Sequence, residues 1–319
     1  MPTKKLKSNQ YHYFGNILRA GVWLLAGMAA QVGAAGYDIW LYPLAKLEKA
    51  PHWRLGEPIK VSDRAGYDNQ AAFSFDGKQL VFASDRAGSH NDIYRFDIAT
   101  GRIDALTHTP EISEYSPQLT AHALTYVAEQ GVPHQSIWQQ SPSEQASPQR
   151  AVASLIPAGY YAKLEGLGTL IWARYAYSLY YEPEGEQADE RHFVINNAGR
   201  SLHALPSLKQ FSYLHKRIDG ERVISLFDPH TGSHTPLIDV GQGSEDYAWS
   251  SDGWLFNLDG LNLRTWPYGP ITKGTPLASW QGVSTLTPPS SHHHQPSRIA
   301  ISPKGNFIAI TWQRKDTDQ

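Results

Sequence analysis

Three adjacent histidines, His292, His293 and His294, are the densest group of potential metal ligands in this sequence. They lie in a polar connection, residues 282–296, that is rich in serine and proline. Imidazole nitrogens often bind divalent metal ions. Three neighbouring side chains of an extended chain cannot all face one ion, because successive side chains point in opposite directions. The pattern therefore favours a solvated loop with no cofactor, and a divalent metal site is the alternative.

A second motif, Ser-Asp-Arg-Ala-Gly, occurs at residues 62–66 and again at residues 84–88. Charged side chains in such loops can hold a polar ligand. The candidate ligand-binding residues are therefore Asp63, Arg64, Asp85, Arg86 and the nearby His90. A structural role is favoured, because an aspartate caps a turn through backbone N–H groups and glycine adopts a positive φ. In that interpretation each arginine pairs with a neighbouring acid.

Aromatic residues are concentrated in residues 160–181. This segment contains Tyr160, Tyr161, Trp172, Tyr175, Tyr177, Tyr180 and Tyr181. Exposed rings can stack on sugars or peptides, whereas buried rings pack between sheets. We expect packing for most of these rings, with carbohydrate binding as the alternative.

Several classes of chemistry find no support in the sequence. It contains no cysteine, which excludes disulfides, thiolate metal ligands and a cysteine nucleophile. It contains no G-x-S-x-G elbow, P-loop or dinucleotide fingerprint. The net charge is −2, with no cluster of basic residues beyond the N-terminus. A nucleic-acid partner is therefore not expected.

Residues 1–35 have the pattern of a secretory signal peptide. Four basic residues and no acid precede or flank an apolar run, residues 20–30, and small residues follow at 31–35. The apolar run is shorter than the roughly 20 residues that span a bilayer. We expect cleavage and a periplasmic or secreted protein, with an uncleaved anchor as the alternative. No membrane span is expected after removal of the signal.

The elements that would position these residues are short strands in repeated units. Residues 68–107 contain four strand patterns, at 70–75, 79–84, 92–98 and 102–107, joined by turns that mostly contain glycine. The turn at residues 228–232 echoes the turn at residues 97–101, an offset of 131 residues or about three units. Four strands per unit of about 44 residues are typical of β-propeller blades.

The two ends of the chain each supply half of a unit. Residues 37–43 and 53–61 read as third and fourth strands, and residues 298–312 read as first and second strands. We therefore predict an all-β chain, with one propeller at residues 36–319 that is closed by pairing of N-terminal with C-terminal strands. About six four-stranded blades are expected. Seven stay open as an alternative, because residues 203–240 and 261–281 are irregular.

One repeat resembles a known family. Phe73-Ser74-Phe75-Asp76-Gly77, Ser84-Asp85-Arg86-Ala87-Gly88 and Asp92-Ile93-Tyr94 together resemble the TolB-like propeller repeat. The resemblance implies the TolB domain order, which is an α/β domain followed by a propeller. No space for the first domain lies between the signal and Tyr37, so the resemblance covers the propeller part alone.

The resemblance and the lack of catalytic signatures lead to three hypotheses of function. The first is an exported, non-catalytic module that binds a protein or peptide in the cell envelope. The second is a metal-assisted lyase or hydrolase that acts on a sugar or small ester through the histidine-rich loop. The third is a carbohydrate-binding propeller that uses the aromatic rings of residues 160–181. The sequence does not indicate an oligomeric state.

Overall fold

The computed structural model describes residues 36–50, 52–131, 134–141, 147–185, 190–272 and 278–315. The predicted signal peptide, residues 1–35, lies outside the described residues. The described residues fall in one compact unit, Ala34–Gln319. Within them the only helix is the single turn α1 (Gly269–Thr272), and every other element is a strand.

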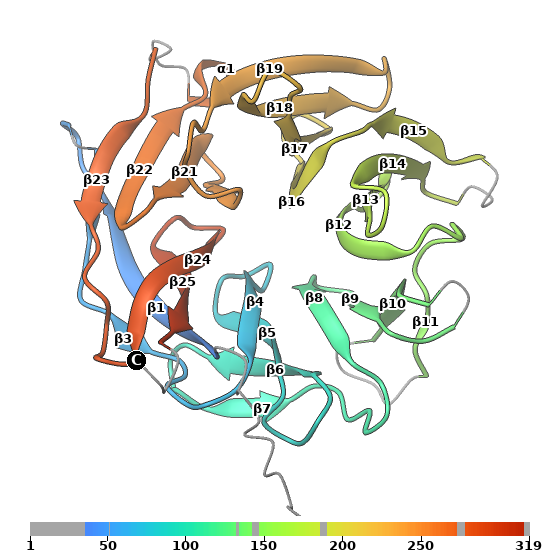
Figure 1. The fold of residues 1–319 in the computed structure, drawn as a ribbon, viewed down its shortest axis with the longest axis horizontal. Coiled ribbons are helices and arrows are strands. Elements are labelled where there is room, and N and C mark those ends of the chain that lie inside the picture. Colours follow the sequence, from blue (N-terminus) through green and yellow to red (C-terminus); the bar gives the residue numbers. More distant parts are fainter. Residues whose placement is uncertain are drawn as a thin grey trace, which may run out of the picture. The chain divides into compact units, whose positions relative to one another are not determined.

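Six antiparallel sheets are arranged in a ring (Figure 1). We number them as blades 1 to 6 in chain order. Blade 1 consists of β4 (Asp68–Phe73), β5 (Gln79–Ser84), β6 (Asp92–Asp97) and β7 (Ile103–Ala105). Blade 2 consists of β8 (Glu114–Leu119), β9 (Leu124–Ala128), β10 (Ser136–Gln140) and β11 (Gln149–Arg150). Blade 3 consists of β12 (Ala158–Leu164), β13 (Gly168–Ala173), β14 (Ser178–Pro183) and β15 (His192–Ile195).

The remaining blades follow the same order, with the first strand of each nearest the centre of the ring (Figure 1). Blade 4 consists of β16 (Ala198–Leu205), β17 (Gln210–Lys216), β18 (Arg222–Asp228) and β19 (Ser233–Asp239). Blade 5 consists of β20 (Tyr247–Trp249), β21 (Trp254–Asp259), β22 (Asn262–Pro267) and β23 (Gln281–Thr285). The prediction of six blades is confirmed, and the seven-blade alternative is wrong. The segment suspected of irregularity at 203–240 completes blade 4.

Blade 6 joins the two ends of the described chain. Its strands are β24 (His293–Ile301), β25 (Phe307–Arg314), β1 (Tyr37–Lys46), and the short outer strands β2 (Trp53–Leu55) and β3 (Ile59–Lys60). Strand β1 pairs with β25 over seven residue pairs, from Tyr37↔Gln313 to Pro43↔Phe307. The predicted closure is confirmed. It leaves no unpaired sheet edge at the junction of the ring, where an open edge would favour aggregation.

The second strand of each blade is buried on both faces, because neighbouring blades cover it. Strands β9 and β13 are buried at every position. Aromatic rings fill the spaces between blades 5 and 6, where Trp53 lies edge-to-face with Phe256 at 5.1 Å between ring centroids and Trp312 is fully buried. Large rings on facing sheets contribute much of the burial energy of such a core.

The turn after the third strand shows why the sequence repeat was informative. In blade 1 Thr100 N–H donates to Asp97 Oδ1 at 2.9 Å, and Gly101 has φ +70°. In blade 4 Thr231 N–H donates to Asp228 Oδ1 at 3.3 Å, and Gly232 has φ +71°. Aspartate satisfies the N–H groups of the turn, and glycine takes the left-handed conformation. The two turns lie three blades apart, as the offset of 131 residues predicts.

The inner strands are interrupted by β-bulges. The pairing register shifts near the start of β4, β8, β12 and β16, and twice in β24. Two of the bulged residues, Gln70 and Ser116, have positive φ angles of 58° and 52°. A bulge turns a side chain away from the alternating pattern of a strand. In this ring, the bulged segments lie beside the axis.

A buried carboxylate holds the junction of blade 6. Asp38 on β1 is fully buried and accepts hydrogen bonds from Arg64 N–H at 2.9 Å, His293 Nε2 at 3.0 Å and Arg314 Nη1. Burial alone would raise the pKa of Asp38, but these three hydrogen bonds hold its pKa below the usual value. The carboxylate therefore ties together β1, β24, β25 and the loop after β3.

We predict that Asp38→Asn lowers the free energy of unfolding by about 3–5 kcal/mol at pH 7, because it leaves buried donors without their anion. The folded pKa of Asp38 is depressed, so its contribution is present above the ordinary value of 3.8 and is lost as pH falls further. Urea unfolding at pH 7 and pH 3 measures both effects. Asp104→Asn, which breaks half-exposed pairs with Arg95 and Arg102, is the control and costs under about 1 kcal/mol. Equal losses in the two variants would contradict the assignment.

Candidate functional site

Two connected cavities lie at the centre of the ring. The smaller one, which we call the axial channel, has a volume of about 260 Å³ and is lined by residues of all six inner strands and by Asp246, directly before β20. The wider one, which we call the mouth, has a volume of about 600 Å³ and lies at the N-terminal ends of the inner strands. Gln70, Tyr160 and Arg200 line both cavities. The axial channel therefore opens into the mouth.

Each blade places a polar side chain near the start of its inner strand, beside the axial channel. In blade order these are Gln70, Ser116, Tyr160, Arg200, Asp246 and Arg298, which we call the axial ring. Five of them lie on inner strands within or beside a bulge, and Asp246 directly precedes β20. The bulges thus aim the axial ring at the centre of the propeller.

Two arginines and one aspartate dominate the electrostatics of the axial channel. Asp246 Oδ2 lies 3.6 Å from Arg298 Nη1, and Asp246 Oδ1 lies 3.7 Å from Arg200 Nε. Arg298 Nη2 donates to Tyr160 Oη at 2.8 Å, and its guanidinium lies 5.2 Å from the centroid of that ring. Burial alone would lower the pKa of Arg298, but the Asp246 carboxylate raises it above its usual value. Arginine side chains stay protonated in proteins, so both guanidiniums carry a positive charge.

His203 also lines the axial channel but contributes no charge at neutral pH. Its Nε2 lies 2.7 Å from the carbonyl oxygen of Tyr247 and donates to it. Burial lowers the pKa of His203 to about 4, because the protonated imidazole would lose its hydration. The ring instead connects the inner strands of blades 4 and 5.

Aromatic rings surround the mouth. They are Tyr67, Tyr115, Tyr160, Trp172, Tyr175 and Tyr177. Trp172 lies edge-to-face with both Tyr160 and Tyr177, with centroids 5.5 Å and 5.4 Å apart. Tyr175 and Tyr177, in the turn between β13 and β14, are 74% and 57% exposed. The aromatic segment at 160–181 therefore divides into rings at the mouth and rings such as Tyr161 and Tyr181 that are buried in the core.

The two Ser-Asp-Arg-Ala-Gly loops contact each other rather than the cavities. Arg64 Nη2 donates to Asp85 Oδ1 at 2.7 Å, and the same oxygen accepts from Tyr67 N–H at 3.0 Å. Arg86 Nη2 donates to Asp68 Oδ1 at 3.0 Å. These pairs are of the kind that the structural interpretation of the motif requires.

The other candidate ligand-binding residues lie outside the cavities as well. Asp63 Oδ1 accepts from Arg314 Nη1 at 2.9 Å. His90 is half-buried, with its Nδ1 3.1 Å from Ser89 Oγ. Asp63, Arg64, Asp85, Arg86 and His90 are absent from the residues that line the axial channel and the mouth.

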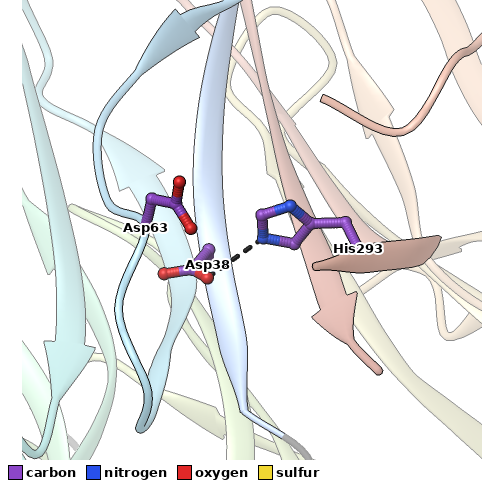
Figure 2. A group of neighbouring side chains, drawn as sticks. All are labelled: Asp38, Asp63 and His293. Carbon is purple, nitrogen blue, oxygen red and sulfur yellow. Dashed lines mark hydrogen bonds and ion pairs between the residues drawn. The ribbon is translucent and has the colours of Figure 1, made fainter. Parts of the chain in front are cut away.

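The three adjacent histidines have different environments. His293 begins β24 and is buried, with Nε2 3.0 Å from Asp38 Oδ2 and Nδ1 2.8 Å from Ser290 Oγ (Figure 2). His292 and His294 are exposed on either side of it. The expectation of a wholly solvated loop is therefore wrong for His293, because the buried carboxylate of Asp38 gives its imidazole a partner inside the protein.

Asp38, Asp63 and His293 bring possible metal-ligand atoms within 4.8 Å of one another (Figure 2). Arg314 Nη1, however, donates to both carboxylates of this group. A guanidinium already supplies the positive charge that a divalent ion would bring, and the two cations would repel each other. His292 and His294 are not in the group. The donor set therefore fits an ion-pair network rather than a metal centre.

The axial ring was not found from the sequence. Its members are polar residues near the start of the first strand of each unit, such as Gln70 and Ser116, which lie 46 residues apart in the chain. Gln70, Ser116, Tyr160 and Arg200 each lie two residues after the start of the first strand, whereas Asp246 precedes its strand and Arg298 lies five residues after the start of β24. The bulges obscure this spacing, because each inserts extra residues into the alternating pattern.

The fold and these cavities define a six-bladed β-propeller with an open axial site. No protein-family model matches the chain, and no curated protein matches it. TolB from Acinetobacter baumannii is similar in structure, with a TM-score of 0.53, 12% identity, and coverage of 88% of this chain and 64% of that one. The chain thus spans less than two thirds of that protein. Putative TolB from Agrobacterium tumefaciens has a TM-score of 0.62, 12% identity, and coverage of 89% and 100%.

Oligogalacturonate lyase from Vibrio parahaemolyticus is also similar, with a TM-score of 0.51, 13% identity, and coverage of 88% of this chain and 98% of that one. The predicted resemblance to TolB-type propellers is confirmed at the level of fold. Identities this low carry information about fold, not about function. Among the described residues, no helix has the length and apolar character needed to cross a bilayer.

A buried acid lies at the interface of blades 1 and 2, next to the mouth residue Tyr115. Glu114 is 1% exposed and accepts a hydrogen bond from Thr107 Oγ1. Burial raises the pKa of Glu114, the hydrogen bond from Thr107 lowers it and the nearby Asp92 raises it, and together these effects bring the pKa to about 7. Glu114 lines neither cavity, so its shifted pKa affects stability rather than ligand chemistry.

We predict that Glu114→Gln stabilises the protein by roughly 2–4 kcal/mol at pH 8 and has little effect near pH 4. The folded pKa of this acid lies above its ordinary value of 4.5, so the folded state binds the proton more tightly. Stability conferred by the protonated form is therefore complete below pH 4.5 and is lost as pH rises to about 7. Urea unfolding from pH 4 to pH 8 measures the difference. Glu111→Gln, an exposed neighbour, should change stability by under about 0.5 kcal/mol. A pH-independent effect of Glu114→Gln would refute the assignment.

Proposed function

We propose that residues 36–319 form a non-catalytic binding module of the cell envelope, which holds a peptide segment of a protein partner at the mouth. The observation that carries this proposal is the mouth itself. It combines about 600 Å³ of space, six aromatic rings and a direct connection to the axial channel. Concave sites of this size with convergent polar groups are typical binding sites.

The chemistry of the mouth suits a peptide. Tyrosine and tryptophan offer large, rigid contact area together with a polar atom, and they are enriched in protein interfaces. Tyr175 and Tyr177 expose this surface at one side of the mouth. Gln70 and Arg200 offer hydrogen-bonding groups at its floor, as the backbone amides of a peptide require. Lys216 and Glu245 form an ion pair within the lining.

The lyase alternative is supported by fold similarity to an oligogalacturonate lyase and by the Asp38, Asp63 and His293 group. Arg314 occupies the position where that group would need its ion. The carbohydrate-binding alternative relies on Tyr175 and Tyr177, whose exposed rings could also stack on a sugar. We favour a peptide because the polar groups at the floor of the mouth, Gln70 and Arg200, converge at the axis rather than lie along a flat aromatic surface.

Peptide selection tests the proposal. A phage-displayed library of random dodecapeptides is selected against the tag-free protein, and dissociation constants of selected peptides are measured by calorimetry. We expect the double variant Tyr175→Ala and Tyr177→Asn to weaken binding by about tenfold or more, because it removes exposed aromatic area at the mouth. Asparagine tolerates the φ of +51° at residue 177.

Phe193→Ala is the matched control, because Phe193 is an exposed ring that does not line the mouth. It should leave the affinity unchanged. Failure to select any peptide, together with binding on a glycan array, would favour the carbohydrate alternative. One Mn, Ca or Zn ion per chain that is lost in His293→Gln would favour the lyase.

Export is tested by N-terminal sequencing. We expect the mature chain from an envelope fraction to begin at Ala35 or Gly36, since small residues at 32 and 34, or 33 and 35, fit signal cleavage. Leu24→Arg combined with Leu25→Arg should block export, because it charges the apolar run. Arg19→Lys, which keeps the charge, is the control. An intact N-terminus in the membrane fraction would indicate an uncleaved anchor.

A further inference from the structure

We propose that the axial channel is a carboxylate subsite, in which Arg298 and Arg200 bind an acidic group of the peptide held at the mouth. This inference rests on the proposed function and specifies the chemistry of its ligand. It starts from the charges of the axial ring. Two guanidiniums share the single carboxylate of Asp246, so the ring carries a net charge of +1.

The hydrogen-bonding capacity of the ring is largely unused. A guanidinium has five N–H donors. Among the described residues, Arg298 donates one hydrogen bond, to Tyr160 Oη, and Arg200 Nε is buried without a partner. Asp246 lines the channel and its side chain is more than nine-tenths buried, and its Oδ2 likewise has no hydrogen-bond partner. Buried polar groups without partners are costly. An acidic group could complete the unused donors of the two guanidiniums, whereas Asp246 Oδ2 would repel it and opposes its binding.

Asp246 neutralises only one of the two positive charges of the site. Its oxygens lie 3.6 Å and 3.7 Å from the nearest guanidinium nitrogens, beyond ordinary hydrogen-bond length. The other charged groups of the mouth form pairs among themselves or with neighbours. Lys216 pairs with Glu245, and Arg174 pairs with Glu129 at 3.8 Å. The uncompensated positive charge therefore stays at the axis, where partial burial strengthens its attraction for an anion.

The positions of Arg200 and Arg298 indicate how an anion would enter the channel and where it would bind. Arg200 is 39% exposed and lines both the mouth and the axial channel, whereas Arg298 is 16% exposed and lines the channel alone. An acidic group that enters from the mouth meets Arg200 first and Arg298 last. The ring of Tyr160 packs on the Arg298 guanidinium and accepts its hydrogen bond, so this arginine is held in place before binding. A planar guanidinium that is fixed in this way suits two-point binding of a carboxylate.

The test uses synthetic heptapeptides of random sequence in two pools, one with a free C-terminal carboxylate and one amidated. Peptides that bind the tag-free protein are identified by mass spectrometry. We expect enrichment of Asp or Glu at one position in both pools if a side chain enters the channel. If the chain terminus enters, binders come from the carboxylate pool alone. In either case the affinity of the best peptide should fall as NaCl is raised.

Variants at the axial ring are expected to change the affinity for the acidic peptide in opposite directions. Arg200→Gln and Arg298→Gln should each weaken the best acidic peptide by about 10- to 100-fold, as expected for loss of a charged hydrogen bond. Asp246→Asn should strengthen it severalfold, because it removes the competing carboxylate. Arg95→Gln, at an ion pair outside both cavities, should have no effect. Arg200 Nε has no hydrogen-bond partner in the described structure, so the Arg200 variant is expected to fold, and circular dichroism checks the folding of each variant.

Three results would contradict the inference, each in a different way. Peptides that bind without an acidic group, with equal affinity for wild type and both arginine variants, would leave the mouth as a peptide site and refute the carboxylate subsite. Tight binding of an oligogalacturonate probe with no peptide binding would refute the proposed function, and dependence of that binding on Arg298 would show the subsite to serve an acidic sugar. Weakening by Asp246→Asn would also refute the assigned charge balance.

Discussion

Closure of blade 6 is the constraint on which the remainder of the structure depends. A ring of sheets is stable only if its first and last strands pair, because an open ring exposes two unpaired edges. Strands β1 and β25 meet this need through seven residue pairs, and the buried Asp38 carboxylate joins them to β24 and to the loop after β3. The inner strands can face one another across an axis only after this closure. The channel and the mouth are thus consequences of pairing between segments nearly 280 residues apart.

The axial site shows how a regular scaffold produces an irregular surface. Alternation along a strand would direct every second side chain toward a neighbouring blade. Bulges interrupt the alternation in the inner strands and direct polar side chains to the axis. The cost is backbone strain at residues such as Gln70 and Ser116. Gln70 offsets part of that strain, because its Oε1 accepts the Ser116 N–H at 2.6 Å and joins the inner strands of two blades.

Sequence reasoning predicted the fold well and the site poorly, for one physical reason. Strands and turns are local, so the Asp97 and Asp228 turns and the half-units at the two ends were recognisable from spacing alone. The side chains that meet at the axis, by contrast, come from segments far apart in the sequence, so local spacing does not reveal them. Nothing near Arg298 in the sequence indicates that it contacts Tyr160, from the opposite side of the ring. The histidines at 292–294 form a local cluster that the sequence does show. Only His293 of the three is buried, and its partner is an aspartate near the other end of the chain.

The axial ring also has a consequence for how such a protein changes its ligand. Its six members, one from each blade, lie far apart in the sequence but next to one another in space. Each lies on or beside the inner strand of its own blade, and of the six only Tyr160 packs against these cores between blades. A substitution at one of the six can therefore alter the charge or shape of the axis with little effect on folding. The six positions are coupled, because Gln70 bonds Ser116, Arg298 bonds Tyr160, and Asp246 pairs with Arg200 and Arg298. A single substitution in the ring therefore also changes the partners that its neighbours offer to a ligand.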